Sequence, residues 1–217
     1  VFELHNAAVW GSDPLGYSIL GTRETVSALD VNALRDLHTS AYHPGRLVVA
    51  AAGNVDHDAL IDILDRTGWH DRSAGPMELA SASRPGTHPA PSRQNIARDG
   101  SQTHIVLGSP MIGHRDERRH AMVLLCVVLG GGMSSRLFQR IREELGLAYP
   151  VYTFQTFYAD TGVQGIYVGT APKTADAALA AIEDELATLV KAGLTDEEIE
   201  QGKGQLKGQL TLSLESP

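Results

Sequence analysis

The sequence is poor in cysteine and in positive charge, and it lacks a long apolar run. Its single cysteine, Cys126, excludes an internal disulfide, and the apolar run around it predicts a small core side chain rather than a nucleophile. The formal net charge of -8 argues against nucleic acid and anionic membrane surfaces as partners, because both attract basic patches. No apolar run approaches the roughly 18 residues that a membrane helix needs.

In its other features the sequence has the composition of an ordinary globular protein. The 217 residues exceed one average domain, and 42% of them are hydrophobic, which is enough for two modest domains with real cores. No basic segment is followed by an apolar segment in the manner of a signal peptide, so we expect a cytoplasmic location. The chain opens on Val1 without a methionine and closes in a helical pattern, which favours a segment of a longer protein.

The first block, residues 1–72, predicts three helices and one strand. A helix is already under way at the start of the chain, and Asp30 and Asp56 are typical N-cap residues for two more. The short apolar run at residues 46–52 predicts a strand that is buried on both faces. The residues expected to face inward from the second and third helices are Leu34, Leu37, Tyr42, Leu60, Ile63 and Leu64.

The second block, residues 93–217, follows a linker at residues 73–92 in which prolines gather among Ser, Ala and Gly. A hairpin is expected around Asp99 and Gly100, between strands at 94–98 and 103–108. Thr195 and Glu198 have the spacing of a capping box. The further elements expected here are helices at 121–129, 134–145 and 174–192 and strands at 149–158 and 163–170. The two blocks together predict an α/β (α+β) protein of two domains.

No string in the sequence has the spacing of a catalytic zinc site. The motif His-x-x-Glu-His and its inverse place two imidazoles one helical turn apart, with a glutamate that activates water. The nearest pattern is formed by His114 and His120, which are six residues apart and so lie about 120° from facing each other on a helix. We therefore expect a charged helix start there, and no metal ligand in this chain.

The most informative stretch is residues 129–149. Gly130, Gly131 and Gly132 allow a tight turn, but no lysine follows them as a phosphate-binding loop requires. The next helix is basic and amphipathic, Gly146 would end it, and Tyr149 begins a strand. The basic residues of that helix are Arg136, Arg140 and Arg142. From the residues alone, packing with solvated charge explains this stretch as well as a binding site does.

The stretch resembles the Gly-Gly-Gly-Met-Ser-Ser-Arg-Leu-Phe…Ile-Arg-Glu…Gly-Leu-Ala-Tyr signature in the C-terminal half of the pitrilysin/insulinase family of zinc peptidases. That family includes the mitochondrial processing peptidases. Other segments resemble the family in the correct order, so the resemblance covers essentially the whole chain. They are Asp13-Pro-Leu-Gly16, Ile19-Leu-Gly21, Tyr42-His-Pro44, Ala52-Gly-Asn-Val-Asp56, Gln102-Thr-His-Ile-Val106 and the closing Leu-Ser-Leu-Glu-Ser-Pro217.

The resemblance implies the metallopeptidase LuxS/processing-peptidase-like fold, with two related open-sheet domains and helices packed on one face of each sheet. Residues 1–72 would be the C-terminal part of the first domain, and residues 93–217 most of the second. The zinc ligands and the catalytic glutamate would lie upstream of Val1, so no catalytic residue is expected here and no zinc bound to this chain. Arg142 and Tyr149 match the arginine and tyrosine with which the family's second half binds substrate.

The resemblance further implies a fragment of a zinc-dependent metallo-endopeptidase acting on peptides or unfolded polypeptides. This chain would supply the substrate-binding half, with a peptide as partner and a homo- or heterodimer as the assembly. Two alternatives stay open, a non-catalytic partner subunit of the same family and an unrelated α/β interaction module. A packing role also stays open for the pair, with Arg142 bound to Glu143 or Glu144 and Tyr149 buried.

Overall fold

The computed structural model describes residues 1–42, 47–68 and 90–215, and the chain divides into two compact units. One unit comprises Val1–Ser18 and Arg84–Pro217, and the other is Ile19–Ser83. The predicted division into residues 1–72, 73–92 and 93–217 stays a prediction. Residues 73–89 of the predicted linker lie outside the described residues.

A three-stranded antiparallel sheet in the order β1-β3-β2 is the centre of the first unit. Its strands are β1 (Thr103–Ile112), β2 (Ala148–Phe157) and β3 (Thr161–Thr170). The predicted hairpin at residues 94–100 is wrong, because residues 94–98 form no strand and β1 pairs along its whole length with β3. β1 is an edge strand, and among the described residues nothing pairs with its free edge, where the hairpin would have placed residues 94–98.

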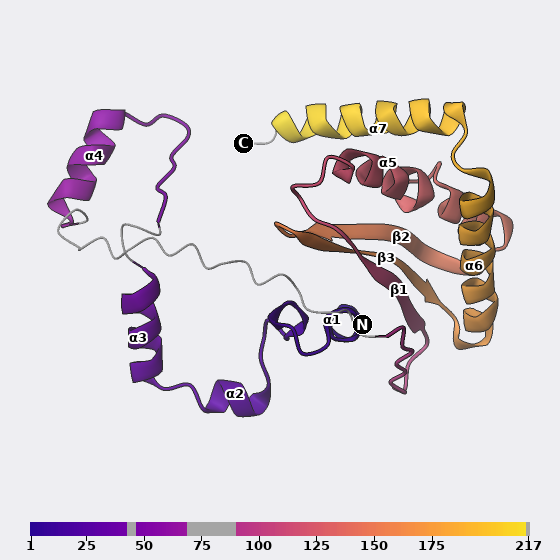
Figure 1. Ribbon diagram of the computed structural model, residues 1–217, viewed down its shortest axis with the longest axis horizontal. Coiled ribbons are helices and arrows are strands. Elements are labelled where there is room, and N and C mark those ends of the chain that lie inside the picture. The colour runs from indigo at the N-terminus through magenta and orange to yellow at the C-terminus, as the bar shows by residue number, and fades with distance from the viewer. Residues whose placement is uncertain (43–46, 69–89, 216–217) are drawn as a thin grey trace. The chain divides into compact units, whose positions relative to one another are not determined.

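Helices cover one face of this sheet, as the α+β prediction required (Figure 1). They are α5 (Arg119–Gly130), the π-helical segment η3 (Phe138–Glu144) and α6 (Ala175–Ala192), which follows a short 3-10 turn at Pro172–Thr174. The largest fully buried side chains between helices and sheet are Leu137, Ile141, Val168 and Ile182. The long helix α7 (Asp196–Leu214) packs on α5, with Gly202 close against Leu124 and Val128.

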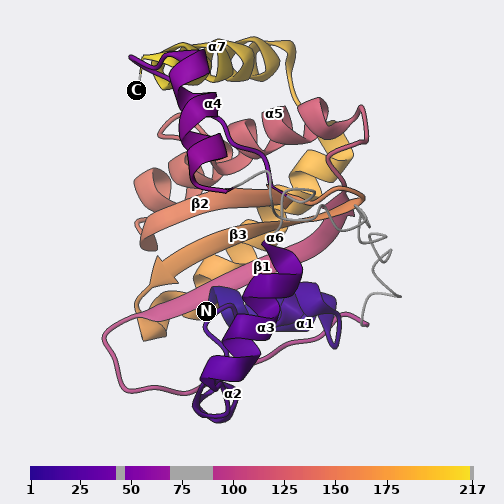
Figure 2. The same cartoon turned by 90° about the vertical axis from the view of Figure 1, so that its left-hand side faces the viewer.

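The opposite face of the sheet is covered in part by α1 (Phe2–Trp10), which lies beside β1 (Figure 2). Phe2 stacks on Tyr167 of β3 with 5.6 Å between the ring centroids. The His5 ring meets Phe154 of β2 edge to face at 5.5 Å. Val9 and Trp10 are buried against Val163 of β3, and a 3-10 turn at Pro14–Gly16 follows the helix. The first helix of the chain therefore forms a second, smaller core on this face of the sheet.

The second unit contains α2 (Arg23–Ser27), α3 (Val31–Ala41) and α4 (His57–Arg66). Asp30 and Asp56 cap α3 and α4 as predicted, since each carboxylate accepts a hydrogen bond of 2.8 Å from the backbone N–H three residues later. No helix in the described ranges of either unit has the length and apolarity needed to cross a bilayer.

The predicted strand at residues 46–52 is wrong for its described part, residues 47–52, which belong to no strand. Val48 is 91% exposed, whereas a strand buried on both faces needs neighbouring strands. The described part of this unit contains none. Several side chains predicted to face inward are exposed: Leu34, Leu37, Tyr42 and Ile63. Leu60 and Leu64 are half-buried.

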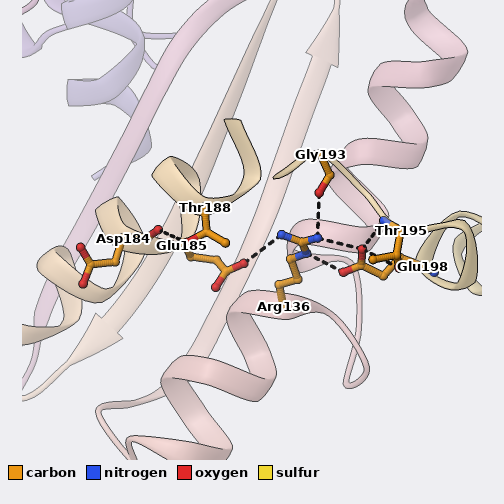
Figure 3. Close-up of polar contacts among 7 residues, drawn as sticks. All are labelled: Arg136, Asp184, Glu185, Thr188, Gly193, Thr195 and Glu198. Carbon is orange, nitrogen blue, oxygen red and sulfur yellow. Dashed lines mark hydrogen bonds and ion pairs between the residues drawn. The ribbon is translucent and has the colours of Figure 1, made fainter. Parts of the chain in front are cut away.

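Arg136 joins the start of the helix that contains η3 to the corner between α6 and α7 (Figure 3). Its Nε and Nη2 donate to the two carboxylate oxygens of Glu198 at 2.5 and 2.8 Å. Nη2 also donates to the carbonyl oxygen of Gly193 at 3.0 Å, and Nη1 donates to Glu185 at 3.3 Å. Glu198 closes the predicted capping box with Thr195 at the start of α7, so one carboxylate serves both contacts.

The docking of α1 should weaken in mild acid, because burial lowers the pKa of His5 below its usual 6.5 and outweighs the opposing effect of Asn6. The undocked imidazole takes up a proton first as the pH falls below that value, so the docked state loses stability there and keeps it above. Trp10 fluorescence in a Trp69→Phe background, titrated from pH 8 to 5, reports the change. A His5→Leu variant should flatten the titration, and an unaltered curve would contradict this account.

Replacing Glu198 with Gln should lower the free energy of unfolding by about 1–3 kcal/mol at pH 7, because the mostly buried Arg136 then loses the nearer of its two carboxylate partners and keeps only Glu185 at 3.3 Å. Hydrogen bonds from Arg136 lower the pKa of Glu198 from 4.5 to about 2. The stabilisation is therefore complete above pH 4.5 and is lost as the pH falls towards 2. Urea denaturation at several pH values measures both effects, with Glu144→Gln, in an exposed pair, as the control. Equal losses in the two variants would count against the Arg136 contacts.

Candidate functional site

The two predicted site residues, Arg142 and Tyr149, lie on consecutive elements joined by a tight turn. Arg142 belongs to η3, and Tyr149 is the second residue of β2. Gly146 occupies the turn with φ of 60°, a left-handed conformation that glycine adopts without steric cost. The N–H of Leu147 donates to the carbonyl of Ile141 at 2.9 Å and closes the turn. The chain therefore returns Tyr149 alongside the helix that carries Arg142.

The guanidinium of Arg142 stacks on two aromatic rings. Its central carbon lies 4.0 Å from the ring centroid of Tyr149 and 4.6 Å from that of Phe138. These distances are typical of cation–π contacts, which hold a guanidinium flat against a ring. The structure thus brings the two residues together, with the guanidinium over both rings.

The polar contacts of Arg142 are weak by comparison. Its Nη1 is 3.5 Å from the carbonyl oxygen of Tyr149, and its Nε is 3.5 Å from the carboxylate of Glu143, both at the outer limit of a hydrogen bond. Glu144 binds Arg140 instead, at 2.7 Å. Tyr149 is 74% exposed, so it is not the buried side chain that the packing alternative expects. A guanidinium has five N–H donors, and a ligand can reach this one.

The backbone is irregular on both sides of the pair. In η3 the N–H of Leu145 donates to the carbonyl of Arg140 at 3.1 Å, five residues earlier rather than four. In β2 the register with β3 shifts between Ala148 and Val151, on either side of Tyr149. Such π-turns and β-bulges are frequent at functional sites, where they redirect a side chain. No residue pattern in the sequence indicated either irregularity.

Metal binding finds no support in the described part of the chain. No group of three or more His, Cys, Asp or Glu residues there could hold an ion. His114 and His120 are both exposed, the first in the loop after β1 and the second at the start of α5. Cys126 is buried, and burial raises the pKa of its thiol to about 11, so it is un-ionised at neutral pH. The prediction of a core cysteine is confirmed.

Arg136 is the residue whose place the sequence least revealed. It was grouped with Arg140 and Arg142 as basic charge on one helix, yet its side chain is only 15% exposed. Its partner Glu198 is 62 residues further along the chain, so no local spacing could point to the pair. The mostly small residues that precede it, at 130–135, indicate no partner for Arg136.

Comparison with known proteins adds the family. The model of the peptidase M16 inactive domain matches residues 28–206. An uncharacterized zinc protease of Streptomyces coelicolor is 41% identical over 99% of this chain and 48% of its own length. The uncharacterized zinc protease YmxG of Bacillus subtilis is 36% identical over 100% of this chain and 52% of its own length. The chain thus spans about half the length of the curated relatives it matches.

Solved structures agree on the fold. The M16 inactive domain from Pseudomonas fluorescens has a TM-score of 0.79 at 24% identity. The match covers 95% of this chain and 50% of the Pseudomonas chain. A protease from Helicobacter pylori has a TM-score of 0.78 at 20% identity, and the match covers 97% of this chain and 52% of the protease chain. The predicted α+β class and its metallopeptidase-like arrangement are confirmed. As the pitrilysin/insulinase motifs predicted, the chain belongs to the peptidase M16 family, and it matches that family's inactive domain.

Proposed function

We propose that this chain is the substrate-binding half of a zinc-dependent metallo-endopeptidase that acts on peptides or unfolded polypeptides. The observation that carries the proposal is the stack of Arg142 on the exposed ring of Tyr149. Relatives named zinc proteases, each about twice as long, support a parent in which another part holds the metal. No residue of this chain is assigned to the zinc or to proton transfer.

The pair suits the recognition of a peptide backbone. The guanidinium of Arg142 and the hydroxyl of Tyr149 can each donate a hydrogen bond to a peptide carbonyl, which holds the peptide in register or polarises the carbonyl. The contacts with Phe138 and Tyr149 already restrict the position of the guanidinium, so less conformational entropy is lost when a peptide binds.

A non-catalytic partner subunit is the second candidate, because a chain that matches an inactive domain suits such a subunit equally well. The residues that precede this segment in the parent separate the two candidates. The motif His-x-x-Glu-His there would make the parent an enzyme. A cytoplasmic location and a homo- or heterodimeric assembly complete the proposal.

In the full-length parent, Arg142→Ala and Tyr149→Phe should each lower kcat/KM for peptide cleavage about a hundredfold, since one hydrogen bond to the transition state is worth about 3 kcal/mol. Melting temperatures should change little, because Tyr149 is exposed. Arg140→Ala and Tyr17→Phe, also on exposed side chains, are the matched controls and should retain full activity. Unchanged cleavage by folded Arg142 and Tyr149 variants would refute the proposed role of the pair.

We expect the full-length parent protein to bind zinc and the isolated 217-residue chain to bind none. After washing with a chelator and re-addition of zinc, the full-length protein should hold one zinc per chain and regain its peptidase activity. The 217-residue chain treated in the same way should hold none, as elemental analysis would show. A stoichiometric zinc on the isolated chain would contradict the proposal, and a full-length protein without zinc or activity would favour the partner subunit.

A further inference from the structure

The Arg136 anchor, formed by Arg136 with Glu185, Gly193 and Glu198, lies on the same helix as the candidate site. Arg136 opens this helix, and Arg142 follows six residues later. The anchor contacts come from α6, from its end and from α7, so the helix is fixed to a part of the unit remote in sequence. The anchor and the site thus lie at the two ends of one short helix.

The hydrogen-bond spacing changes between these two ends. The N–H of Gln139 donates to the carbonyl of Ser135 at 3.0 Å, which is the α-helical spacing of four. The N–H of Leu145 then donates to Arg140, with a spacing of five. One additional residue is therefore accommodated between Arg136 and the turn at Gly146.

The wider spacing is the less favourable one, so an unconstrained helix would return to the α form. That return would turn the residues before the widened turn by about 100° and shift them by about 1.5 Å relative to those after it. The turn at Gly146 is held by the bond from Leu147 to Ile141 and by the pairing of β2 with β3. The rotation would then carry Arg136 away from Glu198.

We propose that Arg136 is a positioning residue for the candidate site. Its bonds to Glu198, Glu185 and Gly193 hold η3 in the π-helical register, and in that register Arg142 lies over Phe138 and Tyr149. The role of Arg142 and Tyr149 in peptide binding rests on the function proposed above. The effect of Arg136 on the position of Arg142 is independent of that function.

The first test is made by NMR on the 217-residue chain. A guanidinium above two aromatic rings experiences their ring currents, so the Nε–H proton of Arg142 should resonate upfield, with Arg142→Lys used to assign it. Arg136→Met keeps the side-chain stem but removes the charged fork, and it should abolish more than half of the upfield shift. Arg140→Met, on the same helix in an exposed pair with Glu144, should leave the shift intact.

Retention of the full shift in folded Arg136→Met would overturn the inference. If that variant does not fold, the measurement moves to Glu198→Gln, which keeps Arg136 and removes its main partner. The shift should again be reduced there. A full shift in the folded Glu198→Gln chain would overturn the inference as well.

The second test is a double-mutant cycle on cleavage by the full-length parent, with rates normalised to the folded fraction of each variant. Arg136→Met should lower kcat/KM about tenfold or more, since a displacement of about 1 Å at an active site can cost a hundredfold. In an Arg142→Ala background it should have no further effect. The same loss in both backgrounds would show that Arg136 does not act through Arg142.

The two tests separate the two proposals. If Arg142→Ala itself leaves cleavage unchanged, the proposed function of the pair fails, and the NMR measurement still decides whether Arg136 positions it. If Arg142→Ala abolishes cleavage and the NMR shift survives Arg136→Met, the proposed function stands and the positioning role is wrong.

Discussion

The first unit depends on β3. This central strand pairs with β1 on one side and with β2 on the other, and most of its ten residues are buried. Val168 and Ile166 face the helices, and Tyr167 and Val163 face α1. Because side chains alternate along a strand, one segment supplies the core on both sides of the sheet. The turn of η3 and the start of β2, with the candidate site, are placed by their attachment to it.

Local patterns predicted much of the second block. The expected helix at 174–192 and the strand at 163–170 correspond closely to α6 and β3, and the capping box of Thr195 and Glu198 has the geometry its spacing implies. The errors arise where a pattern needs a distant partner. The apolar run at 46–52 suits a central strand, but the described part of its unit has no strands to flank it. The turn at Asp99-Gly100 suits a hairpin, but residues 94–98 are exposed and form no strand, and β1 pairs only with β3, about 60 residues later.

The candidate site came from a resemblance, and the residues alone could not have supplied it. Arg142 and Tyr149 are seven apart, a spacing that says nothing until the turn at Gly146 and the wide helical turn are known. The stack of the guanidinium on Tyr149 depends on both. The role of Arg136 was still less accessible, because its charge is neutralised by carboxylates that belong to α6 and α7. Sequence periodicity describes one helix at a time. The contacts of Arg136 join three helices, so periodicity could not reveal them.

The placement of α1 on the sheet also constrains how the protein is made. Val9 and Trp10 leave the ribosome about 150 residues before the strand that buries them, so closing this loop is entropically costly and comes late. Until β3 has been synthesised, an apolar helix remains exposed and open to association with other nascent chains. Chaperone demand during translation should therefore be greatest between the emergence of α1 and that of β3.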